Sequence, residues 1–330
     1  MTMRSFDYGR PGSVDDVIAA LGAAPTRDAV RPLAGGTDLL TLMKGDIVAP
    51  DRLLDLKRLP GLGDGIAVRD DTLVLGALAT LGAIETDAFV REHCPALAMA
   101  ASLAATPQLR NRATLGGNLL QRPRCWYFRE HLIPCWLKGG DDCPAREGEN
   151  AYHALFAESP CVAVHPSDLA TVLMAVDASV LVRGTGGERM ISAGAFFAGP
   201  EEARRRENTL GADEVILSVS IPAGTGRGSV YRKAMDRKAW AFALVSAACA
   251  VRLDGGVIRD ARVVLGGVAP IPLRSSVAEA ILEGQAPGAD LFSRAAHAAV
   301  ERSEPLRHNA YKVPLARSLV IAALEDLTIS

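Results

Sequence analysis

The spacing of apolar positions divides the first part of the chain into short helices and strands. From residue 14 to 21 apolar side chains recur at the spacing of one helix face, and the preceding Ser13 is typical of a helix cap. A short apolar run at residues 30–34 then predicts a strand that enters a pair of glycines. A brief helix is predicted over residues 39–44. Helix and strand periods therefore alternate from the start of the chain.

The same reading assigns the remaining elements, with alternation taken as strand and wider spacing as helix. Strands are predicted at residues 53–56, 66–68, 73–76, 179–182, 214–221, 229–234, 241–253 and 257–268. Helices are predicted at residues 80–93, 95–105, 168–176, 277–282, 291–301 and 315–327. The order of elements indicates an α+β protein. Because its last hundred residues give strands followed by helices, we expect a separate C-terminal α+β domain after a boundary near residues 224–228.

Composition is consistent with a sizeable core. Hydrophobic residues make up 49% of the 330 positions and charged residues 22%, with a formal net charge of −2. The chain has no surplus of basic residues of the kind that would indicate nucleic-acid binding. The longest apolar run, residues 239–251, is too short to span a bilayer, so we expect no membrane insertion. The first residues contain no apolar segment typical of a signal peptide.

The stretch 121–161 differs from the rest of the chain. It contains four of the six cysteines, two of the three tryptophans and several prolines, and it has no clear helix or strand period. A long loop-like stretch inside a compact domain is usually functional or disordered, and the aromatics and cysteines argue against disorder. We therefore interpret residues 121–161 as an ordered, functional insertion.

The four cysteines are Cys125, Cys135, Cys143 and Cys161, spaced C-x9-C-x7-C-x17-C. Disulfides fit if the protein works in an oxidising compartment. Zinc fits four thiolates but usually shows close cysteine pairs, which are absent here. A cubane iron–sulfur cluster tolerates irregular spacing when a loop wraps it. The spacing leaves iron–sulfur and disulfide equally open, with zinc less favoured. His131 and His153 are further potential ligands.

Two glycine pairs are candidates for phosphate binding. Gly35-Gly36 lies between a predicted strand and helix, where successive backbone N–H groups can surround an anion and Thr37 adds a hydroxyl. Gly116-Gly117 lies in a second polar turn. Either could be a plain turn. Two such loops in a chain without net positive charge favour one extended, phosphate-bearing cofactor. The G-x-G-x-x-G fingerprint is absent.

Taken together, these motifs resemble those of the flavin subunits of the xanthine dehydrogenase and carbon-monoxide dehydrogenase family. The resemblance extends over nearly the whole chain and rests on six motifs in order. They are Ala34-Gly35-Gly36-Thr37-x-Leu-Leu, Ala113-Thr114-x-Gly-Gly-Asn, His165-Pro166-Ser167-Asp168, the segment 214–222, Tyr231-Arg232-Lys233-Ala234 and Val264-Leu265-Gly266-Gly267-Val268-Ala269.

The resemblance implies bound FAD and a two-subdomain FAD-binding fold of the vanillyl-alcohol-oxidase (PCMH) type. It is followed by a C-terminal α+β domain of the CO dehydrogenase flavoprotein type. The implied domains are residues 1–225, with subdomains at about 1–58 and 59–225 and the insertion at 121–161, and residues 226–330.

The family's cofactor contacts carry over position by position. The pyrophosphate is expected against Arg31, Pro32, Leu33, Ala34, Gly35, Gly36, Thr37, Asp38 and Leu39, and a second loop is formed by Thr114, Gly117 and Asn118. Asp168 is expected to approach the flavin through a sugar or ribityl hydroxyl, and Ile216 to line the adenine side. Arg232 or Lys233 is expected near the isoalloxazine ring, where a cation would stabilise reduced flavin. In the alternative readings Asp168 only caps a helix, Lys233 is a surface charge and Ile216 is ordinary core.

A narrower likeness rests on three phrases, Gln108-Leu109-Arg110-Asn111, Asn118-Leu119-Leu120-Gln121-Arg122 and Ala241-Phe242-Ala243-Leu244-Val245-Ser246. They resemble the flavin subunits of bacterial periplasmic aldehyde oxidoreductases, and a subset of the family carries an insertion of this kind that holds a [4Fe–4S] cluster. This implies Cys125, Cys135, Cys143 and Cys161 as ligands, shielded from water by the aromatics Trp126, Tyr127, Phe128 and Trp136.

The implied function is an electron-relay subunit without catalytic residues of its own. A large molybdenum-cofactor subunit would oxidise the aldehyde, a small subunit with two [2Fe–2S] clusters would pass electrons to the FAD, and an external acceptor would receive them. The alternatives are a flavin subunit of the xanthine dehydrogenase or 4-hydroxybenzoyl-CoA reductase type, a one-chain flavin dehydrogenase, and a non-catalytic assembly protein with zinc or disulfides. We expect a periplasmic location by co-export with a signal-bearing partner, with the cytoplasm as the alternative.

Overall fold

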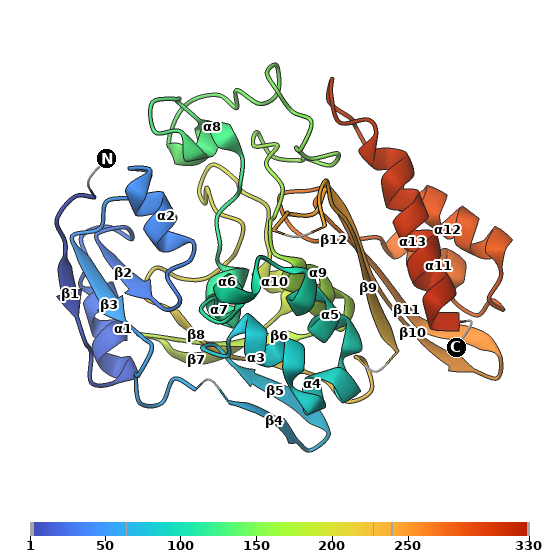
Figure 1. Ribbon diagram of the computed structural model, residues 1–330, viewed down its shortest axis with the longest axis horizontal. Helices are drawn as coiled ribbons and strands as arrows, with labels where there is room; N and C mark the ends of the chain where they lie inside the picture. The colour runs from blue at the N-terminus through green and yellow to red at the C-terminus, as the bar shows by residue number, and fades with distance from the viewer. Residues whose placement is uncertain (1–2, 64, 227, 239, 329–330) are drawn as a thin grey trace.

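A computed structural model describes residues 3–63, 65–226, 228–238 and 240–328. Its strands form three sheets of three, five and four strands, and each sheet has helices beside it (Figure 1). The mixed helix and sheet content confirms the predicted α+β class. Residue 227 of the predicted boundary and residue 239 of the apolar run lie outside the described residues.

The first sheet is parallel and has the order β1-β3-β2. Its elements are β1 (Asp7–Gly9), α1 (Val14–Gly22), β2 (Val30–Leu33), α2 (Leu39–Lys44) and β3 (Arg52–Asp55). The predicted cap of α1 is confirmed, because the Ser13 side chain accepts a hydrogen bond of 3.1 Å from the backbone N–H of Asp16. Strand β2 ends directly before the first glycine pair, so the sheet fixes where that loop begins.

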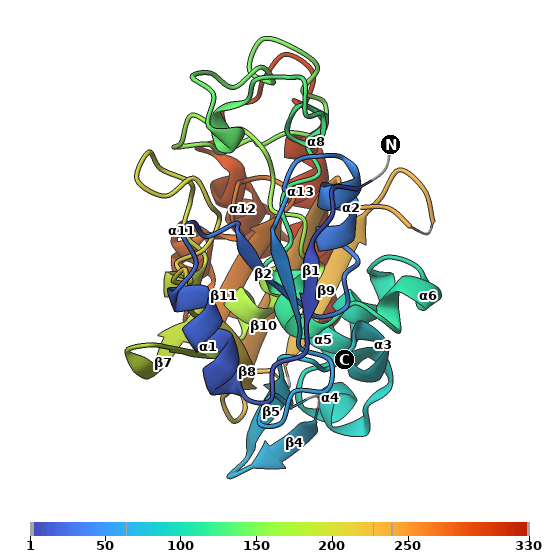
Figure 2. The ribbon, with the colours of Figure 1, turned by 90° about the vertical axis from the view of Figure 1, so that its left-hand side faces the viewer.

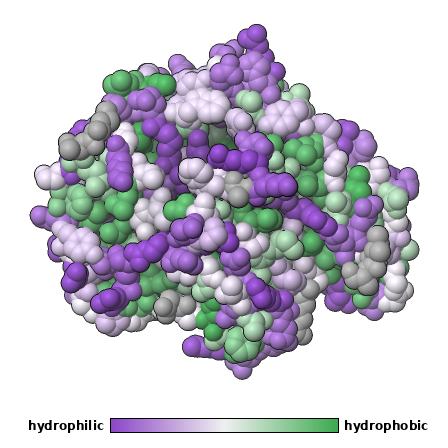
Figure 3. Space-filling view, in the orientation of Figure 1, coloured by the Kyte–Doolittle hydropathy of each residue, from purple (hydrophilic) through white to green (hydrophobic). Residues whose placement is uncertain are grey.

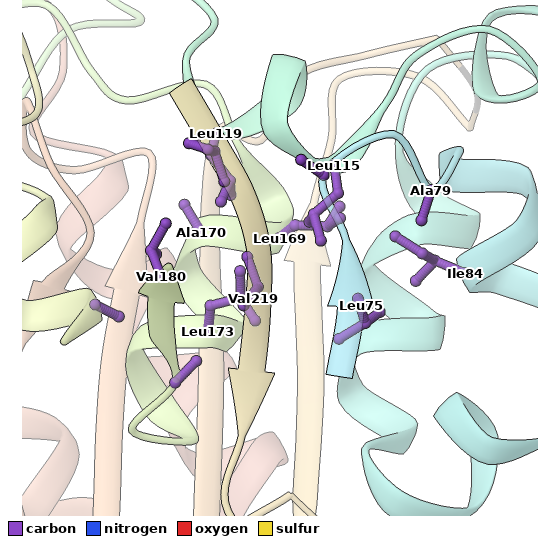
Figure 4. Packing of buried hydrophobic residues seen from close by; sticks show 14 of the residues in the cluster. Leu75, Ala79, Ile84, Leu115, Leu119, Leu169, Ala170, Leu173, Val180 and Val219 are labelled. Atoms are coloured by element: carbon purple, nitrogen blue, oxygen red, sulfur yellow. The ribbon is translucent and has the colours of Figure 1, made fainter. Parts of the chain in front are cut away.

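The second sheet is antiparallel and has the order β4-β5-β8-β6-β7. Its strands are β4 (Ile66–Arg69), β5 (Thr72–Gly76), β6 (Ser179–Gly184), β7 (Gly187–Ser192) and β8 (Val215–Ile221). Its helices are α3 (Leu81–Thr86), α4 (Ala88–His93), α5 (Pro95–Leu103), α6 (Pro107–Arg110), α7 (Leu115–Leu119), α9 (Asp168–Ala175) and α10 (Ala193–Phe196). Strand β8 lies between strands far from it in sequence, and Figure 4 shows the apolar side chains packed around it.

One predicted helix is wrong as a single element. Residues 80–93 form α3 and α4, with a break at Asp87. Asp87 has extended backbone (φ −65°, ψ 133°), and its carboxylate accepts a hydrogen bond from the N–H of Val90. A single Asp thus ends one helix and caps the next, which the apolar spacing does not reveal.

The third sheet, with the order β12-β11-β10-β9, begins the C-terminal region. Its elements are β9 (Ser229–Ala234), β10 (Val245–Asp254), β11 (Val257–Gly266), β12 (Leu273–Arg274), α11 (Ser276–Leu282), α12 (Ala289–Val300) and α13 (Lys312–Thr328). The predicted strand at 241–253 was too long at its start, because β10 begins at Val245. Strand β9 contacts elements that are far from it in the sequence, because both α5 and α13 pack against it (Figure 1).

The insertion forms a layer above the first and second sheets, at the top of both views (Figures 1 and 2). It contains only α8 (Trp126–Arg129) and the short 3-10 helix η1 (Trp136–Lys138). Phe128 and Trp136 are buried in a small cluster with Leu42 of α2, whereas Trp126 remains 40% exposed. The insertion is therefore ordered by packing against α2 rather than by regular structure of its own.

Among the described residues no helix combines the length and apolar character that crossing a bilayer requires. Hydrophilic and hydrophobic residues are interspersed over the face shown in Figure 3.

Candidate functional site

The two glycine loops touch each other backbone to backbone. A Cβ atom added to Gly35 would lie 2.0 Å from the carbonyl oxygen of Arg112, so only glycine fits at this contact. Gly36 has a φ of +74°, in the left-handed region that glycine adopts without strain. Of the glycine pair after β2, Gly35 thus allows the two loops to approach closely, and Gly36 allows the sharp turn into α2.

The first loop presents unused backbone donors. No hydrogen bond joins the N–H groups of Gly35, Gly36 or Thr37 to an acceptor in the described part of the chain. Unpaired N–H groups ahead of a helix attract phosphate oxygens, because they supply both hydrogen bonds and partial positive charge. This loop has the geometry of a phosphate cradle.

In the second loop, the backbone N–H groups of both glycines already donate hydrogen bonds within the protein. The N–H of Gly116 donates to the carbonyl of Ala77 (2.9 Å), and that of Gly117 donates to Oγ1 of Thr114 (3.3 Å), which caps α7. Thr114 still has a hydroxyl proton to donate. Asn118 accepts a 2.5 Å hydrogen bond from Oγ of Ser167 through its Oδ1, which leaves its Nδ2 protons available. The second loop offers side-chain donors rather than a backbone cradle.

Both loops line one cleft. Its empty volume is about 1360 Å³, including the solvent at its mouth, and it runs from α2 past the second loop to β8. All of the predicted pyrophosphate-loop residues from Arg31 to Leu39 line it, as do Thr114, Gly117 and Asn118. Ile216 of β8 also lines it and is 5% exposed.

Positive charge gathers in this cleft although the chain as a whole is slightly acidic. Its lining includes five arginines and only two carboxylates, Asp38 and Glu214. The arginines are Arg27, Arg31, Arg122, Arg124 and Arg206. Burial, and then the neighbouring Arg27 and Arg122, lower the pKa of Arg206 to about 10. Cations that are buried near one another favour a polyanionic ligand.

Apart from Arg31, these arginines were missed by the sequence reading. They come from the segments before β2, after α7 and before β8, which are far apart in the chain. Charge alone did not distinguish them from other surface residues. Only the assembled fold brings them together.

The Asp38 carboxylate points toward the insertion instead of serving the cradle. It accepts hydrogen bonds from the backbone N–H of Arg122 (2.9 Å) and from the guanidinium of Arg129 (2.8 Å), and it pairs with Arg124 (2.9 Å). A carboxylate facing a phosphate would be repelled. Asp38 lines the cleft as predicted, but its side chain ties the glycine loop to the insertion.

Asp168 and Lys233 form a buried ion pair outside the cleft. Asp168, at the start of α9, accepts hydrogen bonds from the hydroxyl of Tyr231 (2.5 Å) and from Nζ of Lys233 (2.7 Å). The Lys233 side chain is 0% exposed. Burial raises the pKa of Asp168, although the Lys233 charge opposes this effect. Neither side chain lines the cleft described above, and the expected approach of Asp168 to the flavin stays a prediction.

The other cation predicted near the flavin, Arg232, is exposed. Successive residues of β9 point to opposite faces of the sheet, so Arg232 faces away from Lys233. Its guanidinium pairs with Asp326 at the surface. Of the two predicted cations, only Lys233 faces the interior near the second glycine loop. Its link to the cleft is indirect, through Ser167, which caps α9 and bonds to Asn118.

The four cysteines of the insertion gather in one place, and the ionisation of each is affected by at least one other. Cys125 is influenced by Cys135 and Cys143, and a hydrogen bond joins Cys143 to Cys161. That bond, with backbone donors, lowers the pKa of Cys143 to about 6, whereas burial raises the pKa of Cys125 to about 11. All four are free thiols. Nε2 of His153 lies 3.2 Å from Sγ of Cys125, while His131 pairs with Glu130 instead.

The spacing of these thiols disfavours a single ion. Within the described ranges, no group of three Cys, His, Asp or Glu side chains is close enough to hold one metal ion. A cubane places four irons and four sulfides between its thiolates, so its ligands lie further apart than those of one zinc ion. The gathering of four thiols, half-buried to buried, fits the larger group better.

Comparison with known proteins covers nearly the whole chain. Residues 4–224 match the family model for the FAD binding domain in molybdopterin dehydrogenase, and residues 230–327 match the CO dehydrogenase flavoprotein C-terminal domain. The chain is 37% identical to the aldehyde oxidoreductase FAD-binding subunit PaoB of Escherichia coli (strain K12), with 98% of each chain covered. It is 32% identical to the carbon monoxide dehydrogenase medium chain of Hydrogenophaga pseudoflava, covering 97% of this chain and 96% of that one.

A solved structure gives the same result in three dimensions. The carbon monoxide dehydrogenase from Hydrogenophaga pseudoflava that lacks the Mo-pyranopterin moiety of the molybdenum cofactor superposes with a TM-score of 0.78. The sequences are 29% identical, and 98% of each chain is covered. Relatives of this kind are subunits of oxidoreductases.

Proposed function

This chain belongs to the family of FAD-binding subunits of the molybdenum hydroxylases, and we propose that it is the electron-transfer subunit of a molybdenum-dependent aldehyde oxidoreductase. The observation that supports FAD in this cleft most directly is the row of unused N–H groups at Gly35, Gly36 and Thr37, surrounded by arginines. The identity of 37% to PaoB over 98% of the chain supports the aldehyde as substrate class.

The residues divide the work of holding FAD. We propose that the loop 31–39 surrounds the pyrophosphate, with Thr114, Gly117 and Asn118 on its other side. Arg27 and Arg206 would balance the phosphate charge, and Ile216 would cover the adenine. Bound FAD accepts single electrons and delivers two, which suits a relay. The Asp168–Lys233 pair acts behind the cleft by fixing α9 and, through Ser167, the orientation of Asn118.

We propose further that Cys125, Cys135, Cys143 and Cys161 hold a [4Fe–4S] cluster. Support comes from their gathering in one fold of the insertion and from the buried rings of Phe128 and Trp136 in the same small core. These rings exclude water from the thiols. A bound cluster supplies one-electron transfer whose potential depends on hydrogen bonds and solvent exposure.

Because this chain is proposed only to transfer electrons, it needs partner subunits that oxidise the substrate and deliver the electrons. We propose a large molybdenum-cofactor subunit that oxidises the aldehyde, a small 2×[2Fe–2S] subunit that delivers electrons, and an external acceptor. We also propose that the first two sheets make up a FAD-binding domain at residues 1–225 and the third a separate domain at 226–330. The resemblance of the chain to subunits of periplasmic enzymes favours the periplasm, which fractionation of cells would test against the cytoplasm.

One preparation tests the cofactors. The chain is purified without oxygen, its visible spectrum is recorded, and flavin and iron per chain are measured. We expect bound flavin and about four irons per chain. Replacing Cys135 by serine removes the iron and leaves most of the flavin, whereas Cys94→Ser, a buried cysteine outside the insertion, leaves both. A colourless protein contradicts the proposal.

Substrate class needs the assembled enzyme. The chain is expressed together with its two partner subunits, and the complex is offered an aldehyde, a hypoxanthine-type purine or carbon monoxide with an artificial acceptor. Turnover of the aldehyde alone supports the assignment. Turnover of another substrate assigns the chain to a different member of the family.

A further inference from the structure

Lys312, at the start of α13, is a buried cation without an anionic partner. Its residue is 0% exposed, and its Nζ donates to three backbone carbonyls, those of Tyr152, His153 and Gly267, each at 2.9 Å. No carboxylate pairs with it in the described part of the chain. Burying an ammonium group is costly unless a negative charge lies nearby. Burial lowers the pKa of Lys312 to about 7, and an anion bound nearby would favour its charged form.

The lysine lies next to the cysteine insertion. Two of its three acceptors belong to the insertion, and the neighbouring Asn309 donates through Nδ2 to the carbonyls of His153 (3.1 Å) and Ala154 (2.9 Å). In both ribbon views the segment that leads into α13 rises beside the insertion (Figures 1 and 2). The C-terminal region thus holds the backbone of His153 from two side chains.

His153 connects this contact to the cysteines. Its ring is buried, 2% exposed, and its Nε2 lies 3.2 Å from Sγ of Cys125. Trp126 packs against it edge to face, with ring centroids 5.6 Å apart. A thiolate sulfur has no proton to give, so the contact with a ligating Cys125 requires the proton on Nε2. His153 is then placed to donate an N–H···S hydrogen bond.

We propose that Lys312 and His153 together set the reduction potential of the cluster on Cys125, Cys135, Cys143 and Cys161. This inference rests on the cluster assigned under the proposed function. An added electron increases the negative charge on the cysteine sulfurs, so a sulfur-directed N–H and a nearby cation stabilise the reduced cluster more than the oxidised one. Both are positioning residues. Lys312 holds His153 and supplies charge, and His153 donates the hydrogen bond.

A consequence is that the C-terminal region influences electron transfer in the insertion. Asn309 lies just before α13 and Lys312 is its first residue, both more than a hundred residues after Cys161, the last cysteine of the insertion. Hydrogen bonds and charges act strongly where little water screens them, and His153 at this contact is 2% exposed. The reduction potential of the cluster therefore depends on how α13 packs against the insertion.

The test is a redox titration of the whole, cluster-loaded chain followed by electron paramagnetic resonance. We expect Lys312→Met and His153→Phe each to keep about four irons and to lower the equilibrium constant for one-electron reduction about tenfold, equal to a shift of about 59 mV to more negative potential. His153→Gln, which keeps an N–H near the same place, restores a potential close to that of the unmodified chain. His297→Phe on the exposed face of α12 is the matched control and shows no shift.

The sign of the shift separates this role from a merely structural one. A loosened insertion would admit water, which stabilises the more highly charged reduced cluster and moves the potential in the positive direction. Unchanged or more positive potentials in both variants overturn the proposal. If His153→Phe loses its iron, the reduction potential of the Lys312→Met variant alone tests the proposal. A chain without iron refutes the cluster and this inference together, whereas iron with unshifted potentials refutes only the inference.

Discussion

Replacing Gly35 by alanine tests whether the contact between the two glycine loops builds the FAD site. The new Cβ would lie 2.0 Å from the carbonyl oxygen of Arg112, and Cβ atoms in real proteins essentially never come closer than 3.0 Å to such an atom. The obstacle is backbone, so no side chain can rotate away. The two loops must therefore separate by about 1 Å, because close-packed interiors have no room to absorb the overlap.

Two losses follow from that separation. Overpacking of this kind costs about 1–3 kcal/mol of folding stability. The cradle of Gly36 and Thr37 also moves relative to Thr114 and Asn118, and a displacement of about 1 Å can reduce a geometry-dependent interaction on the order of 100-fold. We expect the Kd for FAD to rise by that factor, equivalent to about 2.7 kcal/mol of binding free energy.

The assay is reconstitution of flavin-free protein with FAD, followed by the quenching of flavin fluorescence, with urea unfolding of the same samples. Gly186→Ala is the matched control, since a Cβ there has open space around it and its φ is not in the left-handed region. It should leave affinity and stability unchanged. If Gly35→Ala binds FAD as tightly as the unmodified chain, the two loops do not jointly form the site and the reasoning is refuted.

Three further changes probe the surroundings of the cleft. Asp38→Asn removes the charge that ties the glycine loop to the insertion, so we expect a loss of about 1–3 kcal/mol of unfolding free energy and faster proteolysis within residues 121–161; an unchanged cleavage pattern would contradict this. Lys233→Met leaves Asp168 buried and unpaired, which should cost about 3–5 kcal/mol, and the added change Asp168→Asn should recover part of it in the same urea assay. Burial lowers the pKa of His165 to about 3, so the unfolded chain takes up this proton first as the pH falls. The unfolding free energy should therefore drop from about pH 6.5 toward pH 3 by up to about 1.4 kcal/mol per pH unit from this residue, and His165→Gln should reduce that slope.

Local chemistry was readable from the sequence wherever neighbours along the chain decide the structure. Ser13 caps α1 because its side chain reaches an N–H three residues on, and the glycine pair after β2 allows a turn that other residues resist. The grouping of four cysteines in 37 residues identified the insertion before any fold was known. The family motifs were readable for the same reason, since each is a short run whose backbone must adopt one shape.

Tertiary structure alone decided the roles of the charged side chains. Sequence offered Arg232 and Lys233 as equal candidates, but the alternation of β9 sends one to the surface and buries the other against Asp168. Asp38 belongs to the glycine motif, yet its carboxylate serves the insertion. A side chain's partner depends on which distant element packs against it, and no periodicity records that.

Two further groupings could not be predicted from the sequence, because their members are separated by tens to hundreds of residues. The arginines of the cleft come together because β8 inserts between β5 and β6. Lys312 meets the insertion because α13 lies beside residues 150–154. Sequence by itself determined the short-range turns, the helix caps and the cysteine-bearing insertion, because those depend on backbone geometry over a few residues. The electrostatics of the site depend on charges brought close in space, so they were decided only when the chain folded.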